Sequence, residues 1–221
     1  MARGGCTLGS RGLHTGEVTR VIAGSAGGRR LAVPAGDATR PTSDRAREGL
    51  FGTVVSELGP LTGKRVLDLY AGSGAVGLEA LSRGAREVLL VESDARAAAV
   101  IRANVVAVGL DGARVRQDKV ERTLASPADV RYDLAFADPP YAVTAQAVTR
   151  VLTLLAAGWL ADEALVVIER ATRSGPLDWP PGYQPGKSRR YGEATFWYGW
   201  YAGGMVTCEV PGTVLRPAHE E

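Results

Sequence analysis

Residues 67–77 read LDLYAGSGAVG, an apolar run that leads into the glycines Gly72, Gly74 and Gly77. The spacing G-x-G-x-x-G, between the end of a strand and the start of a helix, is typical of Rossmann-like nucleotide sites. Such a site expects an acidic residue about 20 residues after the first glycine, and Glu92 stands there. Since glycine has no Cβ, the backbone of this turn can approach a ligand closely. The stretch therefore predicts an α/β fold that binds an adenosine-containing cofactor.

The residue that discriminates between adenosine cofactors is Asp68, in the strand before the turn. A fixed carboxylate there repels a pyrophosphate but suits an ammonium or a sulfonium group. S-adenosylmethionine carries both cations and no phosphate, so the turn favours it over a nicotinamide dinucleotide. Glu92 can accept hydrogen bonds from ribose hydroxyls in either cofactor, and a purely structural interpretation, in which the glycines only let helix and strand pack, stays open. Beside these residues, the predicted cofactor site also includes Tyr70, Ala71 and Ser93.

Predicted strands and helices alternate from residue 64 onward. This order indicates a mostly parallel, seven-stranded sheet with helices on both faces. Residues 189–201, RRYGEATFWYGWY, predict two closing strands joined at Gly192–Glu193, with the aromatic run in the sheet core and edge. The predicted strands include 65–70, 87–93, 134–137 and 163–170, and the predicted helices are 75–84, 95–109 and 144–158.

A smaller element precedes this sheet. Two short apolar runs, at 18–24 and 29–34, flank the turn SAGG and predict a β-hairpin. A helix over 44–58 follows, capped by Thr42 or Ser43. The predicted organisation is a disordered extension over 1–17, the hairpin and helix over 18–60, the α/β domain over 61–201 and a tail over 202–221.

The bulk properties exclude several classes of protein. The chain has 221 residues and a net charge of only +2, so a nucleic-acid partner would have to bind a local basic patch. Cys6 and Cys208 have no partner spacing, and His14 and His219 lie near the ends, which excludes a disulfide framework, a zinc pattern and a histidine general base. No apolar run is long enough to span a membrane. We therefore expect a cytoplasmic protein without a metal.

The second motif is Asp138-Pro139-Pro140-Tyr141, after the apolar strand LAFA. It falls at the carboxyl edge of the sheet, where open α/β folds bind ligands. Two consecutive prolines remove two N–H donors and leave carbonyl acceptors. Acceptors at Asp138 and Pro139 can bind the N–H groups of an exocyclic amine and direct its lone pair toward an incoming methyl group. Tyr141 offers a face on which an extruded base can stack.

Asp118 follows the third strand of the sheet and has two interpretations. It stands where a side chain could accept a hydrogen bond from the adenine amino group. It could also cap the short helix predicted after it. The two interpretations are compatible.

Together these motifs resemble a known family. DLYAGSGAVGLEALSRGA (68–85), VES (91–93), DPPY and GWLADEALVVIER (158–170) are similar to class I methyltransferases that methylate amino groups. The preceding TRVIAGSAGGRRLAVP (19–34) and TRPTSDRAREGLF (39–51) resemble the RsmD family, bacterial methyltransferases of guanine N2 in 16S rRNA. The similarity runs from about Thr19 to Tyr201, so the extension and the tail depart from the family pattern.

The resemblance implies a Rossmann-like class I methyltransferase fold and S-adenosylmethionine as cofactor, with S-adenosylhomocysteine as product. It implies that Asp68, Gly72, Gly74, Glu92 and Asp118 surround the cofactor, with Asp138 at both sites, and that residues 138–141 receive the guanine. The implied partner is 16S rRNA or the small ribosomal subunit, and we expect a monomer.

Six arginines between residues 20 and 47 form the candidate RNA-docking element. Composition alone equally allows a solvated surface, because Asp37, Asp44 and Glu48 dilute the charge, but the resemblance favours contacts with RNA phosphates. Arg40 and Thr42 have a further possible place at the cofactor entrance. The predicted RNA-binding residues are Arg20, Arg29, Arg30, Arg40, Thr42, Arg45, Arg47 and Tyr141.

Three other functions remain open at this point. The same DPPY chemistry serves methylation of DNA adenine or of protein glutamine. A noncatalytic RNA-binding protein on a methyltransferase scaffold belongs to another class. The G-x-G-x-x-G pattern also leaves a nicotinamide-dependent dehydrogenase open.

Overall fold

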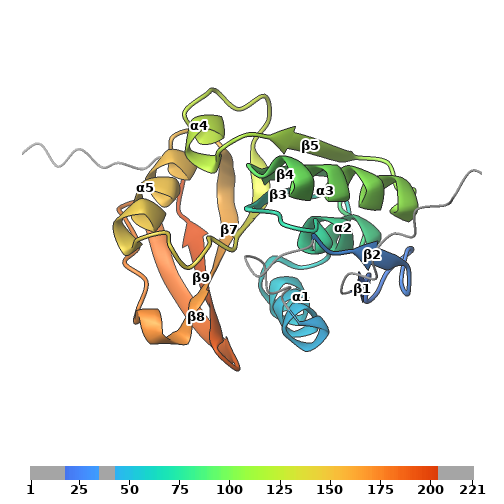
Figure 1. The fold of residues 1–221 in the computed structure, drawn as a ribbon. Coiled ribbons are helices and arrows are strands. Elements are labelled where there is room, and N and C mark those ends of the chain that lie inside the picture. The colour runs from blue at the N-terminus through green and yellow to red at the C-terminus, as the bar shows by residue number, and fades with distance from the viewer. Residues whose placement is uncertain (1–17, 35–42, 204–221) are drawn as a thin grey trace, which may run out of the picture.

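The computed structural model describes residues 18–34 and 43–203 (Figure 1). The predictions for residues 1–17, for Arg40 and Thr42, and for the tail beyond residue 203 lie outside these described residues.

A seven-stranded sheet forms the centre of the molecule, in the order β5-β4-β3-β6-β7-β9-β8. The five strands from β5 to β7 are parallel, and β9 is antiparallel to both of its neighbours. The predicted mostly parallel seven-stranded sheet is therefore confirmed. The strands are β3 (Arg65–Leu69), β4 (Glu87–Glu92), β5 (Ala113–Gln117), β6 (Tyr132–Ala137), β7 (Leu160–Ala171), β8 (Tyr183–Tyr191) and β9 (Ala194–Tyr201).

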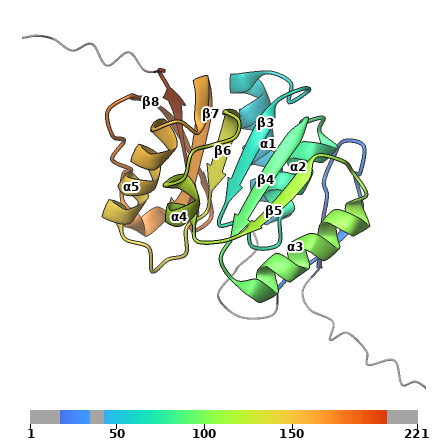
Figure 2. The same cartoon turned by 90° about the horizontal axis from the view of Figure 1, so that it is seen from above.

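Helices cover both faces of this sheet, as Figure 2 shows. One face carries α1 (Asp44–Leu58), α2 (Ala75–Ser82) and α3 (Ala95–Val108), and the other carries α4 (Val120–Leu124) and α5 (Ala145–Ala156). The chain reverses direction across the sheet at β3, because β4 and β5 lie on one side of it and β6 on the other. The carboxyl ends of β3 and β6 thus form the topological switch point at which ligands bind in such folds.

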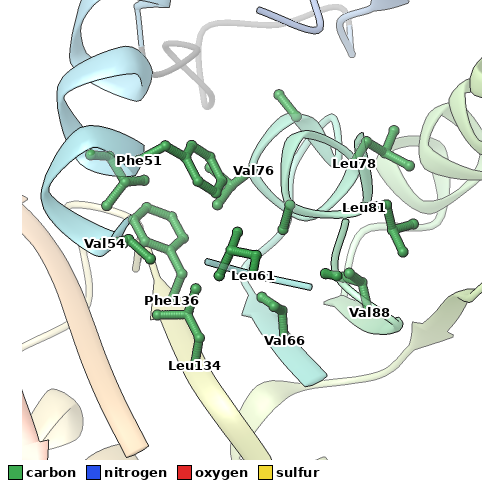
Figure 3. Close-up of a cluster of buried hydrophobic side chains, with 14 of the residues drawn as sticks. Phe51, Val54, Leu61, Val66, Val76, Leu78, Leu81, Val88, Leu134 and Phe136 are labelled. Carbon is green, nitrogen blue, oxygen red and sulfur yellow. The ribbon is translucent and has the colours of Figure 1, made fainter. Parts of the chain in front are cut away.

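The hydrophobic core is split by the sheet into two clusters. In the first, Phe51 and Val54 of α1 and Val76 of α2 pack over Val66 of β3 and Phe136 of β6 (Figure 3). In the second, the alternate side chains of the same strands pack against α4 and α5. Parallel strands buried on both faces need apolar side chains at nearly every position, which explains their continuous apolar runs.

The ends of α1 follow from local chemistry. Ser43 Oγ accepts a hydrogen bond from Ala46 N at 3.2 Å, and Gly59 ends the helix with a φ of +77°. The observed bounds agree with the predicted helix over 44–58. Of the two residues considered for the cap, Ser43 is the one that the structure shows at that position.

The predicted N-terminal hairpin is present, but its strands are shorter than predicted. β1 (Val18–Arg20) and β2 (Arg30–Ala32) have three residues each. The chain between them turns early, because Gly28 N donates to Val21 O at 2.8 Å and Val21 N donates to Arg29 O at 2.9 Å. Val21, next to β1, is fully buried and belongs to the core cluster that also contains residues of α2.

Glu79 of α2 holds this hairpin against the main domain. Its carboxylate is fully buried and accepts hydrogen bonds from Ile22 N at 2.6 Å and Ala23 N at 3.0 Å. Arg83 Nε donates to the same carboxylate at 2.7 Å, which balances its charge. Gly24 lies so close to α2 that an added Cβ would stand 1.9 Å from Ser82 O. The hairpin is therefore an integral part of the structure.

The turn between the two closing strands agrees with its prediction, whereas β8 begins at Tyr183, before the predicted start at residue 189. β8 and β9 meet at Gly192, whose φ is +62°, and Glu193. Phe196 and Tyr198 belong to one core cluster and Tyr201 to the other, so the aromatic run is sheet core as expected. No helix in residues 18–34 or 43–203 is long and apolar enough to cross a membrane.

Candidate active site

The glycine turn and the DPPY turn meet at the switch point of the sheet. Leu69, the last residue of β3, is the register partner of Ala137, the last residue of β6. Asp138 N then donates to Leu69 O at 3.4 Å. Two motifs far apart in sequence therefore lie side by side at the carboxyl edge, as the sequence predicted for each of them separately.

The glycine turn uses backbone conformations that favour glycine. Gly72 has a φ of +56° and Gly74, which precedes α2, has a φ of +77°. An added Cβ at Gly77 would stand 2.8 Å from Val88 Cγ1, so this glycine lets α2 pack on β4. The structural interpretation thus accounts for Gly77, whereas Gly72 and Gly74 shape the turn itself.

Glu92 is fixed at the end of β4 beside this turn. Gly72 N donates to Glu92 Oε2 at 2.9 Å and Asp94 N donates to Oε1 at 2.8 Å. The carboxylate remains partly exposed and has further lone pairs to offer. Its position at the carboxyl edge suits an acceptor for hydroxyl groups, and the predicted contact with ribose stays a prediction. Ser93, the next residue, is exposed.

Asp118 lies next to Glu92, because Asp118 N donates to Glu92 O at 3.0 Å. Its side chain accepts from Lys119 N at 2.8 Å and pairs with Arg122 Nε at 3.4 Å. The residue that caps α4 is Lys119, so the interpretation of Asp118 as the helix cap is wrong by one position. The Asp118 side chain is 20% exposed at the carboxyl edge of the sheet, and its contact with adenine stays a prediction.

Asp68 lies beneath the glycine turn. Its carboxylate is 1% exposed and accepts from Gly77 N at 2.8 Å, which fixes β3 to the first turn of α2. Burial raises the pKa of this carboxyl to about 8, the hydrogen bond from Gly77 opposes that shift, and the charge of Glu92 adds to it. Asp68 therefore has a structural role here, and a contact with the cofactor stays a prediction.

Tyr70 and Ala71 complete the predicted cofactor cluster. Tyr70 has a φ of +58°, unusual for a residue with a side chain, and its hydroxyl donates to Glu121 Oε1 of α4 at 3.2 Å. Burial and the Glu121 charge raise the pKa of this phenol. Ala71 N donates to Val91 O at 3.0 Å, which holds the turn against β4.

Asp138 has acidic neighbours. Burial raises its pKa well above the ordinary value, and the charges of Glu169 and Asp68 raise it further. Glu169, with 9% exposure, follows the register pair Ala137–Ile168 on β7 and so stands next to Asp138. Glu169 was not among the site residues predicted from the sequence. The available signal was an acidic residue at the carboxyl end of a buried strand.

The rest of the DPPY turn faces outward. Pro140 and Tyr141 are exposed, and Tyr141 shows 72% of its surface. Pro140 O accepts from Val143 N at 2.8 Å, and the guanidinium of Arg173 lies 5.7 Å from the centre of the Tyr141 ring. A planar group can reach the aromatic face without any change in the core.

The predicted RNA-docking arginines have different surroundings. Arg20, Arg29, Arg30 and Arg45 are exposed. A cavity of about 300 Å³ is lined by Thr19, Arg20, Arg30 and Asp44. The Arg29 guanidinium donates to Val108 O at the end of α3.

Arg47 does not fit its predicted role. Its side chain is fully buried, and it donates to Arg20 O at 2.6 Å and to Asp44 Oδ1 at 3.0 Å. Burial lowers the pKa of this guanidinium, while Asp44 and Glu79 raise it. The prediction that Arg47 binds RNA is wrong, because this side chain joins α1 to β1 inside the protein and cannot reach a phosphate.

This chain is similar in sequence and fold to known proteins. The family model described as Conserved hypothetical protein 95 matches residues 19–200. Ribosomal RNA small subunit methyltransferase D of Escherichia coli (strain K12) is 36% identical over 172 residues, 75% of this chain and 84% of that protein. Putative rRNA methyltransferase YlbH of Bacillus subtilis (strain 168) is 39% identical over 140 residues, 62% of this chain and 73% of that protein. The solved structure of putative methyltransferase yhhF from Escherichia coli matches with a TM-score of 0.74 and 31% identity, covering 84% of this chain and 98% of its own.

Proposed function

Because this chain belongs to the family described as Conserved hypothetical protein 95, the RsmD family of rRNA methyltransferases, we propose that it methylates N2 of a guanine in 16S rRNA. S-adenosylmethionine-dependent methylation of rRNA follows from the relatives together with the fold. The choice of guanine N2 rests on the family resemblance and on the chemistry of the DPPY turn.

The observation that carries the proposal is the contact between the two motifs. Asp138 N bonds to Leu69 O, so the acceptor-rich turn stands directly beside the glycine turn. A cofactor held at one motif can then reach a base held at the other, and such positioning supplies much of the rate enhancement of a group transfer. A dehydrogenase has no evident use for this DPPY turn beside its cofactor.

The residues at the glycine turn suit S-adenosylmethionine. Glu92 and Asp118 are acceptors at the ends of neighbouring strands, and they would bind the ribose hydroxyls and the adenine amino group. Backbone N–H groups of the turn would approach the cofactor closely. When bound, the cofactor supplies a methyl group on a sulfonium. Among the described residues, no three His, Cys, Asp or Glu side chains gather in a way that could hold a metal.

The chain's own residues prepare the amine. The Asp138 carboxylate and the Pro139 carbonyl would accept the two N–H groups of the guanine amine and direct its lone pair toward the methyl group. Transfer of the methyl group to this nitrogen, with loss of the S–C bond, would leave positive charge on the amine. Asp138 stabilises that charge and, with its raised pKa, can take up the proton that leaves nitrogen. Tyr141 would hold the extruded base by stacking.

The RNA partner, the location in the cell and the roles of the two parts of the chain belong to the same proposal. The partner is 16S rRNA or the small ribosomal subunit, consistent with the name of the E. coli relative, and we place the protein in the cytoplasm as a monomer. Residues 18–60 would dock RNA through exposed arginines, and residues 61–201 would form the methyltransferase domain. Arg20, Arg29, Arg30 and Arg45 remain candidates for phosphate contacts.

The test supplies labelled S-adenosylmethionine and small ribosomal subunits from cells that lack this gene. Label in guanine N2 of 16S rRNA is the expected result, and absence of label would reject the rRNA substrate. Parallel reactions with adenine-containing DNA and with a glutamine-containing protein separate the other amino substrates. Asp138→Asn should strongly reduce methylation but keep RNA binding, which distinguishes an enzyme from a noncatalytic RNA-binding protein.

A further inference from the structure

A second group of arginines lies at the carboxyl edge of the sheet, beyond the DPPY turn. Arg170 of β7 and Arg190 of β8 are both register partners of Thr195, in the strand between them. Directly paired residues of antiparallel strands project from the same face of a sheet. Arg170, Thr195 and Arg190 therefore form one row across three strands, on the face that carries α5.

The spacing within this row is fixed by the sheet. Neighbouring strands lie about 4.8 Å apart, so the two arginines project from points roughly 10 Å apart. Thr195 Oγ1 and Thr172 Oγ1 share a hydrogen bond of 2.9 Å, and Thr172 N donates to Glu193 O at 2.7 Å. These bonds join the end of β7 to the β8–β9 turn, which gives the row a rigid base.

Arg173 connects this row to the active site. It follows β7 in the short 3₁₀ turn Thr172–Ser174, and its guanidinium faces the ring of Tyr141 at 5.7 Å. Arg173 and Arg190 are exposed and Arg170 is partly exposed. Arg173 therefore lies between the end of β7, which carries Arg170, and the aromatic ring on which the target base would stack.

These charges lack carboxylate partners among the residues that the structure describes. Arg114, Arg122 and Arg131, by contrast, each pair with an acidic side chain. Arg190 Nε donates to Gly192 O at 2.9 Å, which orients the group and leaves its terminal N–H donors available. Guanidinium groups in such an array match phosphate oxygens.

We propose that Arg170, Arg173 and Arg190 form a second RNA-docking surface, which binds backbone phosphates next to the target guanine. This inference rests on the proposed function. The surface lies on the β7–β8 side of Asp138, whereas the N-terminal hairpin lies on the side of α2 and α3, and α1 stands between the two in Figure 1. RNA bound to both surfaces would cross the DPPY turn. A phosphate contact at Arg173 would also draw its guanidinium from Tyr141 and free the ring for the base.

The test compares two double variants with the same change of charge. Arg173→Ala with Arg190→Ala removes two charges from the proposed surface. Arg86→Ala with Arg131→Ala removes two from the amino edge of the sheet, where these residues precede β4 and β6. Small subunits from cells lacking the gene serve as the ligand in a filter-binding assay without cofactor, and as the substrate in a methylation assay.

The first double variant should bind the subunit about 10-fold more weakly, and its dependence of log Kd on log salt should fall by about 1.5. Its KM for S-adenosylmethionine should stay within twofold of the wild type, because neither arginine lies at the glycine turn. The amino-edge variant should match the wild type in every assay. A variant with Arg173→Lys, which keeps the positive charge at that position, should retain most of the wild-type affinity for the subunit.

The proposed docking surface would be overturned if the Arg173 and Arg190 double variant bound the subunit as tightly as the wild type. This comparison requires that the thermal unfolding of the variant is unchanged. An equal loss in the amino-edge variant would overturn it too, because the effect would then be one of net charge. Failure of the proposed function is a separate result, since it requires a wild-type protein that binds the subunit but transfers no methyl group to guanine.

Discussion

The backbone N–H of Gly72 donates to the carboxylate of Glu92 at 2.9 Å, so the glycine turn and the end of the next strand form one unit. Glu92 shapes this turn and also offers acceptor oxygens to a ligand. Its replacement should therefore affect cofactor affinity more than the stability of the fold.

Glu92→Ala should therefore weaken S-adenosylhomocysteine binding about 30-fold, because it removes the proposed ribose acceptors and frees Gly72 N from its hydrogen bond. Glu92→Gln, which retains one acceptor oxygen, should lose less. Isothermal titration gives both dissociation constants, with Asp111→Asn as an exposed acidic control. An unchanged dissociation constant in Glu92→Ala would remove this residue from the cofactor site. NADH should give no heat with any of these proteins.

Asp68 makes the stability of the protein depend on pH. Its pKa is raised to about 8 by burial, so the folded protein holds a proton there that the unfolded chain releases near pH 4. The contribution is therefore favourable at low pH and is lost as pH rises toward 8. Relative to Asp68→Asn, the wild type should lose at most about 1.4 kcal/mol per pH unit between pH 5 and pH 8. Urea unfolding at several pH values measures this difference, and parallel curves for the two proteins would contradict the prediction.

Asp138 should be the residue most sensitive to removal of its charge. Asparagine there loses the anionic acceptor, and we expect kcat to fall by roughly 10²–10³ while subunit binding is retained. Single-turnover methylation with saturating cofactor gives the rate. A variant with near wild-type turnover would exclude Asp138 from the chemistry.

Glu169 should set the pH dependence of the same step. Its negative charge is one of the causes that raise the pKa of Asp138, and the ionised carboxylate is the stronger acceptor. The methylation rate should therefore rise with pH through that raised pKa, and Glu169→Gln should move the rise to lower pH. Glu163→Gln, on the exposed part of the same strand, is the matched control and should leave the profile in place. Coincident profiles for all three proteins would argue against an electrostatic role for Glu169.

Glu79 should be essential for the hairpin. Alanine there leaves two backbone N–H groups and Arg83 without their acceptor, which should cost about 3 kcal/mol of unfolding free energy. Equilibrium urea unfolding measures the loss, with Glu48→Ala on the exposed face of α1 as control. Equal midpoints for the two variants would mean that the hairpin is held by apolar contacts instead.

Helices and strands that depend on neighbouring residues in the chain were predicted correctly from the sequence. The bounds of α1 follow from the capping Ser43 and from Gly59, both next to the helix. The parallel strands follow from apolar runs that need no knowledge of their neighbours. The two motifs could be placed at one edge of the sheet because parallel strands all end there.

Residues whose roles depend on distant partners were the ones that sequence reasoning missed. Arg47 lies in a stretch rich in charged residues, which is typical of a protein surface. Its hydrogen-bond partners, however, lie in β1, 27 and 28 residues earlier. Glu79 has the helical position of an ordinary surface acid, yet it accepts from backbone groups 56 and 57 residues away. Burial of these charges depends on how the hairpin docks, and no local pattern in the chain encodes that.

Asn104 of α3 gives the site a property that neither motif has alone. Its buried side chain donates to Ser73 O in the glycine turn at 2.9 Å and exchanges hydrogen bonds with Ala32 of β2. One amide thus belongs both to the cofactor turn and to the hairpin that would meet RNA. If a ligand at the glycine turn or at the hairpin shifts this amide, the hydrogen bonds at the other site change as well. The factor by which cofactor changes RNA affinity must then equal the factor by which RNA changes cofactor affinity, which makes the order of binding thermodynamically immaterial.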